Sequence, residues 1–414
     1  MRKKLQLLLT AVMAAALMVT VNLGVLPETG KAEAAETTLK NPRIVPDDSM
    51  EAGQKVTWDC VWFGSYPQAE VIPSGAEYTA LDESLRQGGD VIVSDSIYAD
   101  LQSASEWDMN NDIVLDGEKY RRIKKEDATS SGNGRSWYQW QDALSWHYFK
   151  YEPVKWRVLH TDESQALILS DIALDDQQYH TVDESVTWET STLRSWLNGY
   201  GAENNKQSRD YSRNNFMGSA FSISEQAAIV DLSLENIGSI QWNTGGGNNT
   251  IDKIFLLSET DIWGMDKVNS YGFIKDGDIY DEAKWCKSST YAKAKGMPSN
   301  SSNQGSSVIY AGNGWWWLRS PGESQNHAKH VSDHGNVKNT TNNVSEAGDG
   351  VRPALNLKLS SLNVYSYAGT VCSDGTQAEV ENVVPSQPGK PETTETEETT
   401  ETEKTTETEE TTET

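Results

Sequence analysis

Alternating apolar and polar positions predict short β-strands along much of the chain. VTWDCVWFGSYPQAEV begins with such an alternation, and we expect Tyr66-Pro67 to close this strand. VKWRVLH and ALILSD are two β-rich runs separated by a polar turn, which is the pattern of a hairpin. WDMNNDIVLDGEKYRRI predicts another hairpin, which turns near Asp116-Gly117. These segments therefore predict strands that pair with their neighbours in sequence.

Two segments follow the helical period instead. In TWETSTLRSWLNG, the residues Leu193, Trp196 and Leu197 fall at i, i+3 and i+4, Thr190 or Ser191 can cap the start, and the final glycine ends the helix. FSISEQAAIVD carries the S-x-x-E capping box of a second helix. Strands gathered around two helices, without a regular βαβ alternation, predict an α+β domain rather than a doubly wound parallel sheet.

The two ends of the chain differ from its middle. Residues 1–34 have a basic start, an apolar run and a small-x-small sequence, which predict a secretory signal peptide; the alternative is an uncleaved anchor. We interpret residues 35–51 as a linker and residues 52–375 as the folded domain, with no transmembrane helix in the mature chain. Residues 376–414 end in a Thr/Glu-rich tract that predicts a disordered stalk. We therefore expect a secreted, extracellular or cell-wall-associated protein.

Charge and cysteine content exclude several classes of function. A formal net charge of −26 repels nucleic acid and anionic lipid, so we expect no nucleic-acid partner. The three cysteines are too few for a disulfide framework and too dispersed for a CxxC site. Cys60 and Cys372 lie near opposite ends of the predicted domain and are candidates for a disulfide; the alternative is that they are free buried thiols.

The segment NHAKHVSDHG concentrates three histidines, His327, His330 and His334. In a helix they would share one face and could present three imidazoles to zinc. In a strand, His327 and His330 would point to opposite faces. Ser332 to Gly335 has the composition of a turn, and no glutamate follows His330 as the HExxH motif requires. We therefore favour a strand and turn, and we expect no native metal site.

A weaker candidate site for calcium precedes the predicted turn. Asp108, Asn110 and Asp112 occupy alternating positions, like the start of an EF-hand loop. Ile113 stands where that loop needs glycine, and Lys119 stands where it needs glutamate. A hairpin turn without a cofactor is therefore the favoured interpretation, and calcium remains the alternative.

Fifteen tryptophans are a large number for this length. Flat apolar rings with an N–H group are typical of sugar-binding surfaces, although most tryptophans build hydrophobic cores. In WWWLRS, a strand would place Trp315 and Trp317 on one face and Trp316 on the other. We expect most tryptophans in the core and one or two at a binding surface.

Eight motifs follow one another through the folded region: FGSYPQ (63–68), KWRVL (155–159), LILSD (167–171), WETSTLRSWLNG (188–199), AFSISEQAAI (220–229), DKIFLLSE (252–259), WWLRSPG (316–322) and GVRPALNL (350–357). Together they resemble a family of uncharacterised exported proteins of Gram-positive bacteria. That family has a domain of unknown function with the ending WLRSPG…GVRPAL. The resemblance covers about residues 52–375.

The layout also resembles, less closely, the C-type-lectin-like fold of the formylglycine-generating enzymes and related surface proteins. This resemblance implies an α+β domain with long irregular insertions, in which NHAKHVSDHGNV forms the hairpin between the last strands. Ala328, Val331 and Gly335 would then be framework positions. The sugar-binding tripeptides EPN, QPD and WND do not occur in the sequence, and the paired active-site cysteines are not recognisable. Neither activity is therefore carried over.

From these features we expect an exported surface protein that binds a ligand, either a glycan or another surface protein. The candidate ligand-binding residues are Trp315, Arg319, His327, His330 and His334. No catalytic residue can be selected among 61 acidic side chains. The alternatives are a hydrolase or other enzyme that acts on wall or host polymer, and an assembly module without a small-molecule site.

Overall fold

The structure is a computed structural model that describes residues 38–74, 91–129, 138, 140, 145–263, 271–274, 280–298, 312–361 and 363–378. The predicted signal peptide and the Thr/Glu-rich tract lie outside the described residues. The described residues from Leu39 onward belong to one compact unit. In this part of the chain, every helix is too short or too polar to cross a lipid bilayer.

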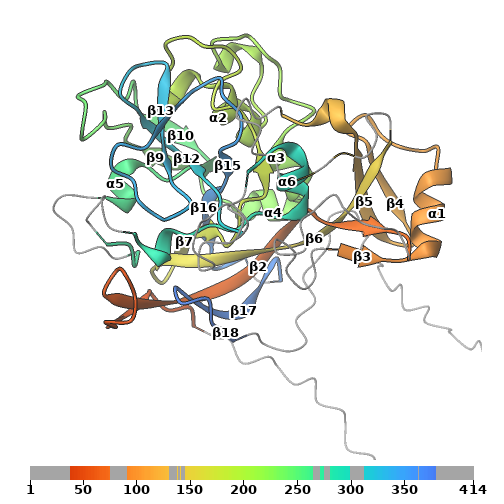
Figure 1. The fold of residues 1–414 in the computed structure, drawn as a ribbon, viewed down its shortest axis with the longest axis horizontal. Helices are drawn as coiled ribbons and strands as arrows, with labels where there is room; N and C mark the ends of the chain where they lie inside the picture. Colours follow the sequence, from red (N-terminus) through yellow and green to blue (C-terminus); the bar gives the residue numbers. More distant parts are fainter. Residues whose placement is uncertain are drawn as a thin grey trace, which may run out of the picture. The chain divides into compact units, whose positions relative to one another are not determined.

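A large, mostly antiparallel sheet is the framework of the fold. Its central strands are, in spatial order, β11 (Ile254–Phe255), β16 (Ala354–Lys358), β7 (Gln165–Ser170), β6 (His147–Thr161), β2 (Gln54–Ile72), β17 (Tyr365–Cys372) and β18 (Gln377–Ala378). β1 (Arg43–Pro46) and β3 (Val91–Val93) pair with β2, whereas β5 (Glu118–Ile123) pairs with β6 and with β4 (Asp112–Leu115). Figure 1 shows β2 and β6 running from the main body to the group formed by α1 (Asp95–Ser103), β3, β4 and β5.

Both predicted hairpins are confirmed. β6 and β7 pair antiparallel across the polar turn after KWRVLH. β4 and β5 turn at Asp116 and Gly117, whose φ angles of 49° and 81° are both positive. Aspartate and glycine tolerate this left-handed backbone, which matches the right-handed twist of the flanking strands. Local turn chemistry was therefore sufficient to predict these pairings.

The predicted end of the first long strand is wrong. β2 does not close at Tyr66-Pro67 but continues to Ile72, for 19 residues in all. Pro67 has no N–H to donate, and the pairing of β2 with β6 shifts register between Pro67 and Glu70. A proline can remain in a strand at such an irregularity because the ladder hydrogen bond that it would remove is already interrupted.

A second sheet combines four strands from residues 316–351 with one short strand at residues 175–176. Its order is β14 (Thr341–Asn343), β13 (His327–Val331), β12 (Trp316–Pro321), β15 (Gly350–Val351) and β8 (Asp175–Asp176). β10 (Thr250–Asp252) and β9 (Leu232–Leu234) form a separate pair. The strand predicted in NHAKHV is confirmed, and the turn after it has φ 84° at Gly335.

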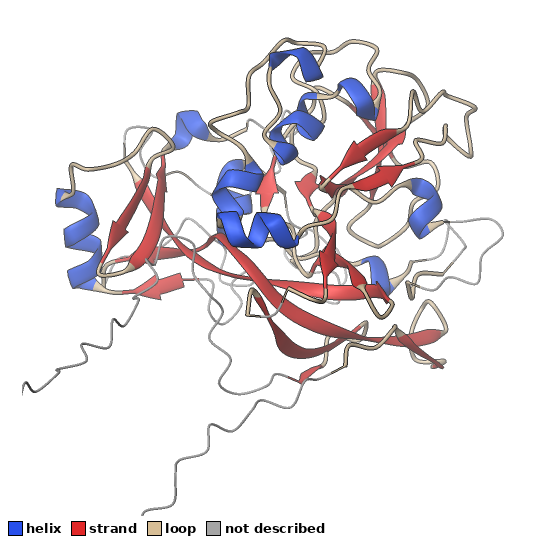
Figure 2. Cartoon of the chain, turned by 180° about the vertical axis from the view of Figure 1, so that it is seen from behind, coloured by secondary structure: helices blue, strands red, loops and turns tan. Residues whose placement is uncertain are grey.

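The helices are short. The α-helices after α1 are α2 (Thr192–Asn198), α3 (Phe216–Ala220), α4 (Ile223–Ala228), α5 (Glu259–Ile262) and α6 (Thr290–Lys295). Single 3₁₀ turns are η2 (Lys125–Asp127), η3 (Trp188–Thr190), η4 (Ala202–Asn204) and η5 (Glu282–Lys284). α2 and α4 are the two predicted helices, while α1, α3, α5 and α6 were not predicted. Most helices lie on one side of β2 and β6 (Figure 2). The α+β class is confirmed.

Tryptophans fill much of the core. Trp58, Trp156, Trp188, Trp316 and Trp317 are almost completely buried. The indole N–H groups of these residues find acceptors inside the protein; that of Trp156, for example, donates to a backbone carbonyl in β2 at 2.7 Å. Trp316 and Trp317 are both buried although they point to opposite faces of β12, because both faces of this strand are covered. The expected structural role of most tryptophans therefore holds for these five.

The described domain is longer than the predicted one at both ends. Residues Arg43–Pro46, placed in the predicted linker, form β1 and pair with β2. Gln377–Ala378, placed in the predicted stalk, form β18 and pair with β17. Both strands are short, and each is fixed by a hairpin pairing with the neighbouring strand in sequence, β2 for β1 and β17 for β18.

Candidate functional site

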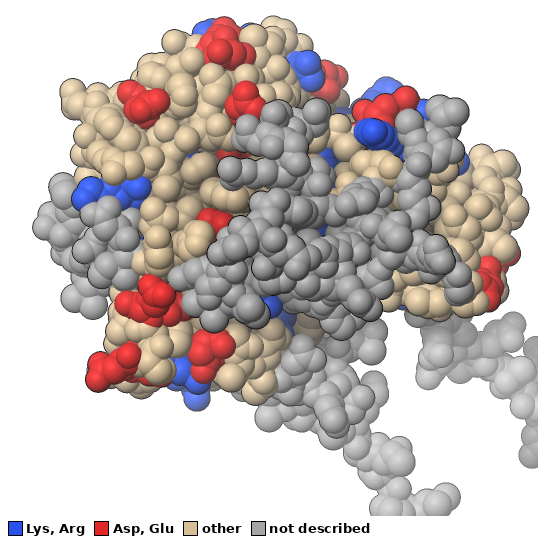
Figure 3. All heavy atoms as spheres, in the orientation of Figure 1, with Lys and Arg blue, Asp and Glu red and all other residues tan. Residues whose placement is uncertain are grey.

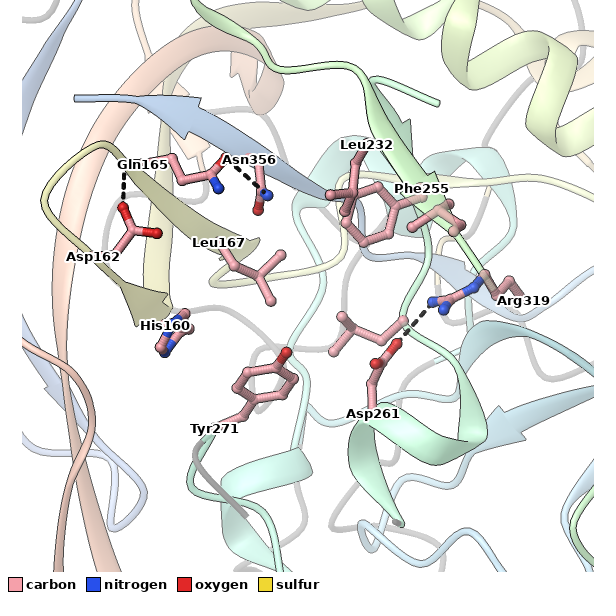
Figure 4. A pocket seen from close by; sticks show the side chains of 12 residues that line it. His160, Asp162, Gln165, Leu167, Leu232, Phe255, Asp261, Tyr271, Arg319 and Asn356 are labelled. Carbon is pink, nitrogen blue, oxygen red and sulfur yellow. Dashed lines mark hydrogen bonds and ion pairs between the residues drawn. The ribbon is translucent and has the colours of Figure 1, made fainter. Parts of the chain in front are cut away.

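A cavity of about 200 Å³ opens beside the large sheet (Figure 4). It is smaller than the ~300–1,000 Å³ typical of pockets for drug-sized ligands, so it suits a single ring or side chain. Half of its lining is apolar and half is polar. The lining residues are His160, Asp162, Gln165, Leu167, Leu232, Leu234, Phe255, Leu257, Asp261, Tyr271, Arg319 and Asn356.

One face of the large sheet supplies the floor of the cavity. Leu167 of β7 pairs with His160 of β6 on one side and with Asn356 of β16 on the other. Directly paired residues point to the same face, so these three side chains form a row across three strands. Phe255 of β11 pairs with Ala354 and extends this face. The alternation in ALILSD and ALNLKL places leucine and asparagine on the cavity side.

Arg319 of β12 and Asp261 of α5 form one wall. The Nη1 of Arg319 donates to Oδ2 of Asp261 at 2.7 Å and to the carbonyl oxygen of Leu256 at 2.8 Å. Asp261 also accepts hydrogen bonds from the N–H and hydroxyl of Ser258 at the start of α5. Burial opposes ionisation of this carboxyl, but Arg319 and Ser258 outweigh it and hold the pKa of Asp261 below its ordinary value. The pair therefore stays ionised and is electrically neutral as a unit.

Two buried polar atoms of the cavity residues lack a hydrogen-bond partner among the described residues: Nε of Arg319 and Oδ1 of Asn356. Both residues are only 7% exposed. The Nδ2 of Asn356 lies 3.4 Å from Oε1 of Gln165, so only the oxygen of this carboxamide is left over. An unpaired buried donor or acceptor costs ~1–3 kcal/mol, and a ligand or water that pairs with it recovers that energy. Two residues that line the cavity thus carry one donor and one acceptor that no other described group satisfies.

Asp162 and Tyr271 lie at the rim. Asp162 accepts hydrogen bonds from the backbone N–H groups of Ser164 and Gln165 and from the hydroxyl of Ser164, and these bonds lower its pKa. Burial, together with the nearby charge of Asp261, raises the pKa of Tyr271 to about 12. At neutral pH the rim therefore presents a carboxylate and a neutral phenol.

Of the ligand-binding residues predicted from sequence, only Arg319 lines this cavity. Trp315 precedes β12 and is half-buried. His327 and His330 lie three residues apart in β13, so their side chains leave opposite faces of the strand. His334 follows in the turn after β13. The five residues therefore do not form one site.

Each histidine of this segment has its own neighbours. The Nδ1 of His327 lies 2.8 Å from the hydroxyl of a nearby serine, Ser324. The Nδ1 of His330 lies 2.9 Å from a carboxylate oxygen of Asp349, and that of His334 lies 2.7 Å from Asp333. Among the described residues, no three His, Cys, Asp or Glu side chains come together as a metal site requires.

The calcium candidates have other partners. The Oδ1 of Asp108 accepts the backbone N–H groups of Asn110 and Asp112, as in an Asx turn. Asp112 is buried, and its carboxylate binds the guanidinium of Arg121 at 2.6 Å and the ammonium of Lys119 at 3.0 Å. In the structure, basic side chains of the same hairpin therefore engage the carboxylate of Asp112, as the favoured interpretation of a hairpin turn allows.

The predicted disulfide between Cys60 and Cys372 is also wrong, since all three cysteines are free. Cys372 pairs with Thr57 across β17 and β2, and its Sγ lies 3.2 Å from the hydroxyl of Thr57. Cys60 lies three residues further along β2, so its side chain points to the other face about 10 Å away. A disulfide needs Cβ atoms ~3.5–4.5 Å apart.

Sequence reasoning missed most residues of the cavity. Asn356 is a polar residue between two buried leucines of β16. A polar residue at such a position was the signal in the sequence that could have indicated a functional site. Asp261 sits at the third helical position of α5, where it closes a capping box with Ser258. In the sequence this pattern marks a helix start and carries no mark of a ligand site.

A comparison with family models finds one match within the chain. Residues 163–359 match the model of a domain of unknown function (DUF6273). This segment is a DUF6273 domain. It contains ten of the twelve cavity residues, whereas His160 and Asp162 precede it. The motifs FGSYPQ and KWRVL also precede the DUF6273 segment. The search of curated proteins and the search of solved structures each returned no match.

Proposed function

We propose that the protein is an exported binding protein that holds a glycan through the Arg319–Asn356 cavity. The observation that carries this proposal is the pair of unpartnered buried atoms, one donor and one acceptor, on two residues that line a cavity with an apolar half. A sugar hydroxyl both donates and accepts, so one or two neighbouring hydroxyls can pair with both atoms. The apolar C–H face of the ring would pack on Leu167 and Phe255.

The electrostatics favour a neutral ligand. Asp261 compensates the charge of Arg319, and Asp162 adds a negative charge at the rim. On the face shown in Figure 3, acidic and basic side chains lie in small groups separated by uncharged surface. An anionic ligand would also meet the net charge of −26. Neither the rim carboxylate nor the net negative charge weakens the binding of a neutral sugar.

The fold that we propose for this function is C-type-lectin-like. It is supported by the order of elements: a long early strand, the helices α2 to α4, the tryptophan-rich β12, the hairpin β13–β14 and a final strand that follows Arg352. The proposed location outside the cell rests on the signal-peptide pattern at residues 1–34.

Binding suits the cavity better than hydrolysis does. A glycosidase needs one carboxyl group that stays protonated near neutral pH and can donate its proton. The two carboxyl groups of the cavity, Asp162 and Asp261, both have pKa values below the ordinary one. They therefore fit the role of hydrogen-bond acceptors rather than that of a general acid.

The test is binding of the purified chain to a broad glycan panel that includes wall and mucin sugars, with calcium and with chelator. We expect binding under both conditions, because the contacts involve no cation. Asn356→Leu keeps the volume of the side chain but removes its acceptor, and it should weaken binding about tenfold. Asn214→Leu, at an exposed asparagine, is the matched control and should bind normally.

Other outcomes discriminate among the alternatives. Unchanged affinity in Asn356→Leu would exclude this cavity as the ligand site. Loss of binding in His327→Ala would place the ligand at the β13 turn instead. Absence of binding to every glycan would reject the proposal and favour a surface protein as the partner or an assembly role.

A further inference from the structure

The side chain of Lys329 is a buried amine that does not line the cavity. Its side chain is fully buried, and its Nζ lies 3.1 Å from Oε1 of Glu259, which is itself buried. The Nζ also lies 4.3 Å from the ring centre of Trp242 and 5.5 Å from that of Trp263. An ammonium group loses its hydration there, and burial lowers the pKa of Lys329 although Glu259 opposes the shift.

The same amine touches a side-chain carboxamide. The Nζ of Lys329 lies 3.2 Å from Oε1 of Gln241. The carbonyl carbon Cδ is one C=O bond, ~1.23 Å, beyond that oxygen. Oε1 of Gln241 also accepts the backbone N–H of Asn339 at 3.1 Å. A backbone N–H at this place polarises the carbonyl and can stabilise negative charge that develops on the oxygen.

We propose that Lys329 and Gln241 form an intramolecular amide cross-link within the folded protein. In this step the Nζ–Cδ bond forms and the Cδ–Nε2 bond of Gln241 breaks. Nζ loses two protons, both of which end on the departing Nε2, so the products are a secondary amide and one ammonium ion. No oxidant or reductant is required, and the cross-link is independent of the proposed glycan site.

Glu259 supplies the proton transfers. Its Oε1 faces Nζ, whereas its Oε2 is held by the backbone N–H of Ile240 at 2.9 Å. The carboxylate takes the first proton from the ammonium group, which makes the amine nucleophilic. It then delivers that proton to the leaving nitrogen, receives the second proton from Nζ and passes it to the departing ammonia, so that Glu259 ends as a carboxylate and the ammonia as ammonium. The fixed positions of amine, carboxylate and carboxamide remove the entropic cost of bringing them together.

The competing interpretation is a permanent ion pair. A charged Lys329 donates to Oε1 of Gln241 and to the carbonyl of Val337 at 3.0 Å, and it forms an ion pair with Glu259. Such an arrangement is stable without any reaction. The two interpretations differ in covalent structure, so a mass measurement separates them.

The test is mass spectrometry of the purified full chain and of its tryptic peptides. We expect the wild-type mass to be lower by one ammonia. Because Asn-Gly sequences can also lose ammonia, the deciding readout is a branched peptide that joins the segments around Gln241 and Lys329. Trypsin should also fail to cleave after Lys329, since the modified side chain carries no charge.

Three variants control the test. Lys329→Arg removes the nucleophile, and Glu259→Gln retains both reacting groups but removes the proton acceptor, so both should lose the branched peptide. Gln325→Glu, which changes a glutamine away from Lys329, should retain it. Two results would overturn the proposal: a wild-type digest with an unlinked Lys329 peptide and no branched peptide, or a branched peptide that persists in Glu259→Gln.

Discussion

Arg319 and Asp261 are joined by a 2.7 Å ion pair that connects β12 to the start of α5 beside the cavity. The side chain of Arg319 is 7% exposed and that of Asp261 is 25% exposed. Each of them therefore depends on the other for compensation of its charge. The same contact shapes the cavity wall and stabilises the fold.

Arg319→Met should lower the free energy of unfolding by about 3–5 kcal/mol, because it leaves Asp261 partly buried without its counter-ion. Urea denaturation at pH 7 measures this change. Lys150→Met removes the exposed ion pair with Glu118, whose atoms lie 3.4 Å apart, and it should cost less than about 1 kcal/mol. Equal losses in the two variants would contradict the importance of the Arg319–Asp261 pair.

Asp176→Asn should change how stability depends on pH. Asp176 is fully buried, and its Oδ2 has no hydrogen-bond partner among the described residues. Burial first, and then the neighbouring Asp175 and Asp349, raise the pKa of Asp176 well above its ordinary value. The native state therefore holds this proton more tightly than the unfolded state does. Its contribution to stability is present below the unfolded pKa of about 4 and is lost as the pH rises through the native pKa.

Unfolding by urea between pH 4 and pH 8 checks this prediction. Asp176→Asn should flatten the part of the profile in which wild-type stability falls with rising pH, so that the variant matches or exceeds the wild type at pH 8. Asp116→Asn, in the exposed turn of β4 and β5, should leave the profile unchanged. A wild-type profile that rises continuously over this range would contradict the raised pKa.

Ser222→Ala should destabilise the protein by about 1 kcal/mol. The Ser222 hydroxyl accepts the backbone N–H of Glu225 at 3.3 Å, and the Glu225 carboxylate accepts that of Ser222 at 2.7 Å. Both bonds satisfy donors at the start of α4. Ile223→Ala, at a side chain that is 87% exposed, is the control and should be neutral. Thermal unfolding of both variants tests whether the loss of stability comes from the capping box or from any shortened side chain at the start of α4.

The thiols should react at very different rates in the native protein. Cys60 and Cys286 are buried, and burial raises the pKa of both thiols, so a thiol reagent should label them only after unfolding. Cys372 is half-exposed and should react without unfolding. Titration with a chromogenic disulfide should therefore count one thiol in the native state and three in urea. A count of one in urea would instead indicate the disulfide.

The sequence predicted those features that depend on a few neighbouring residues. The capping box at Ser222, the glycine after α2 and the Asp116-Gly117 turn all act within four or five residues. The course of β2 beyond Pro67 could not be predicted, because it depends on pairing with β6 across about 85 residues of chain. Taken alone, a proline indicates the end of a strand. Only the pairing with β6 shows that β2 continues beyond Pro67.

The cavity was beyond prediction for the same reason. Its floor requires the order β6, β7 and β16, in which the third strand comes from the far end of the folded region. Arg319 was predicted as a candidate ligand-binding residue, but its partner Asp261 was not predicted. The histidines attracted attention because they are close in sequence, yet the strand separates His327 from His330 onto opposite faces.

β2 also determines how the domain would respond to a mechanical force applied between its ends. Arg43 of β1 and Cys372 of β17 both pair with Thr57, from opposite sides of the strand. The described chain thus enters and leaves within about two strand spacings, ~10 Å, of one point. A force applied between these ends would first load β1 and β17 and would peel them away from β2. The cavity is built mainly on β7, β11 and β16, outside that line of tension, and would keep its shape while the ends are pulled apart.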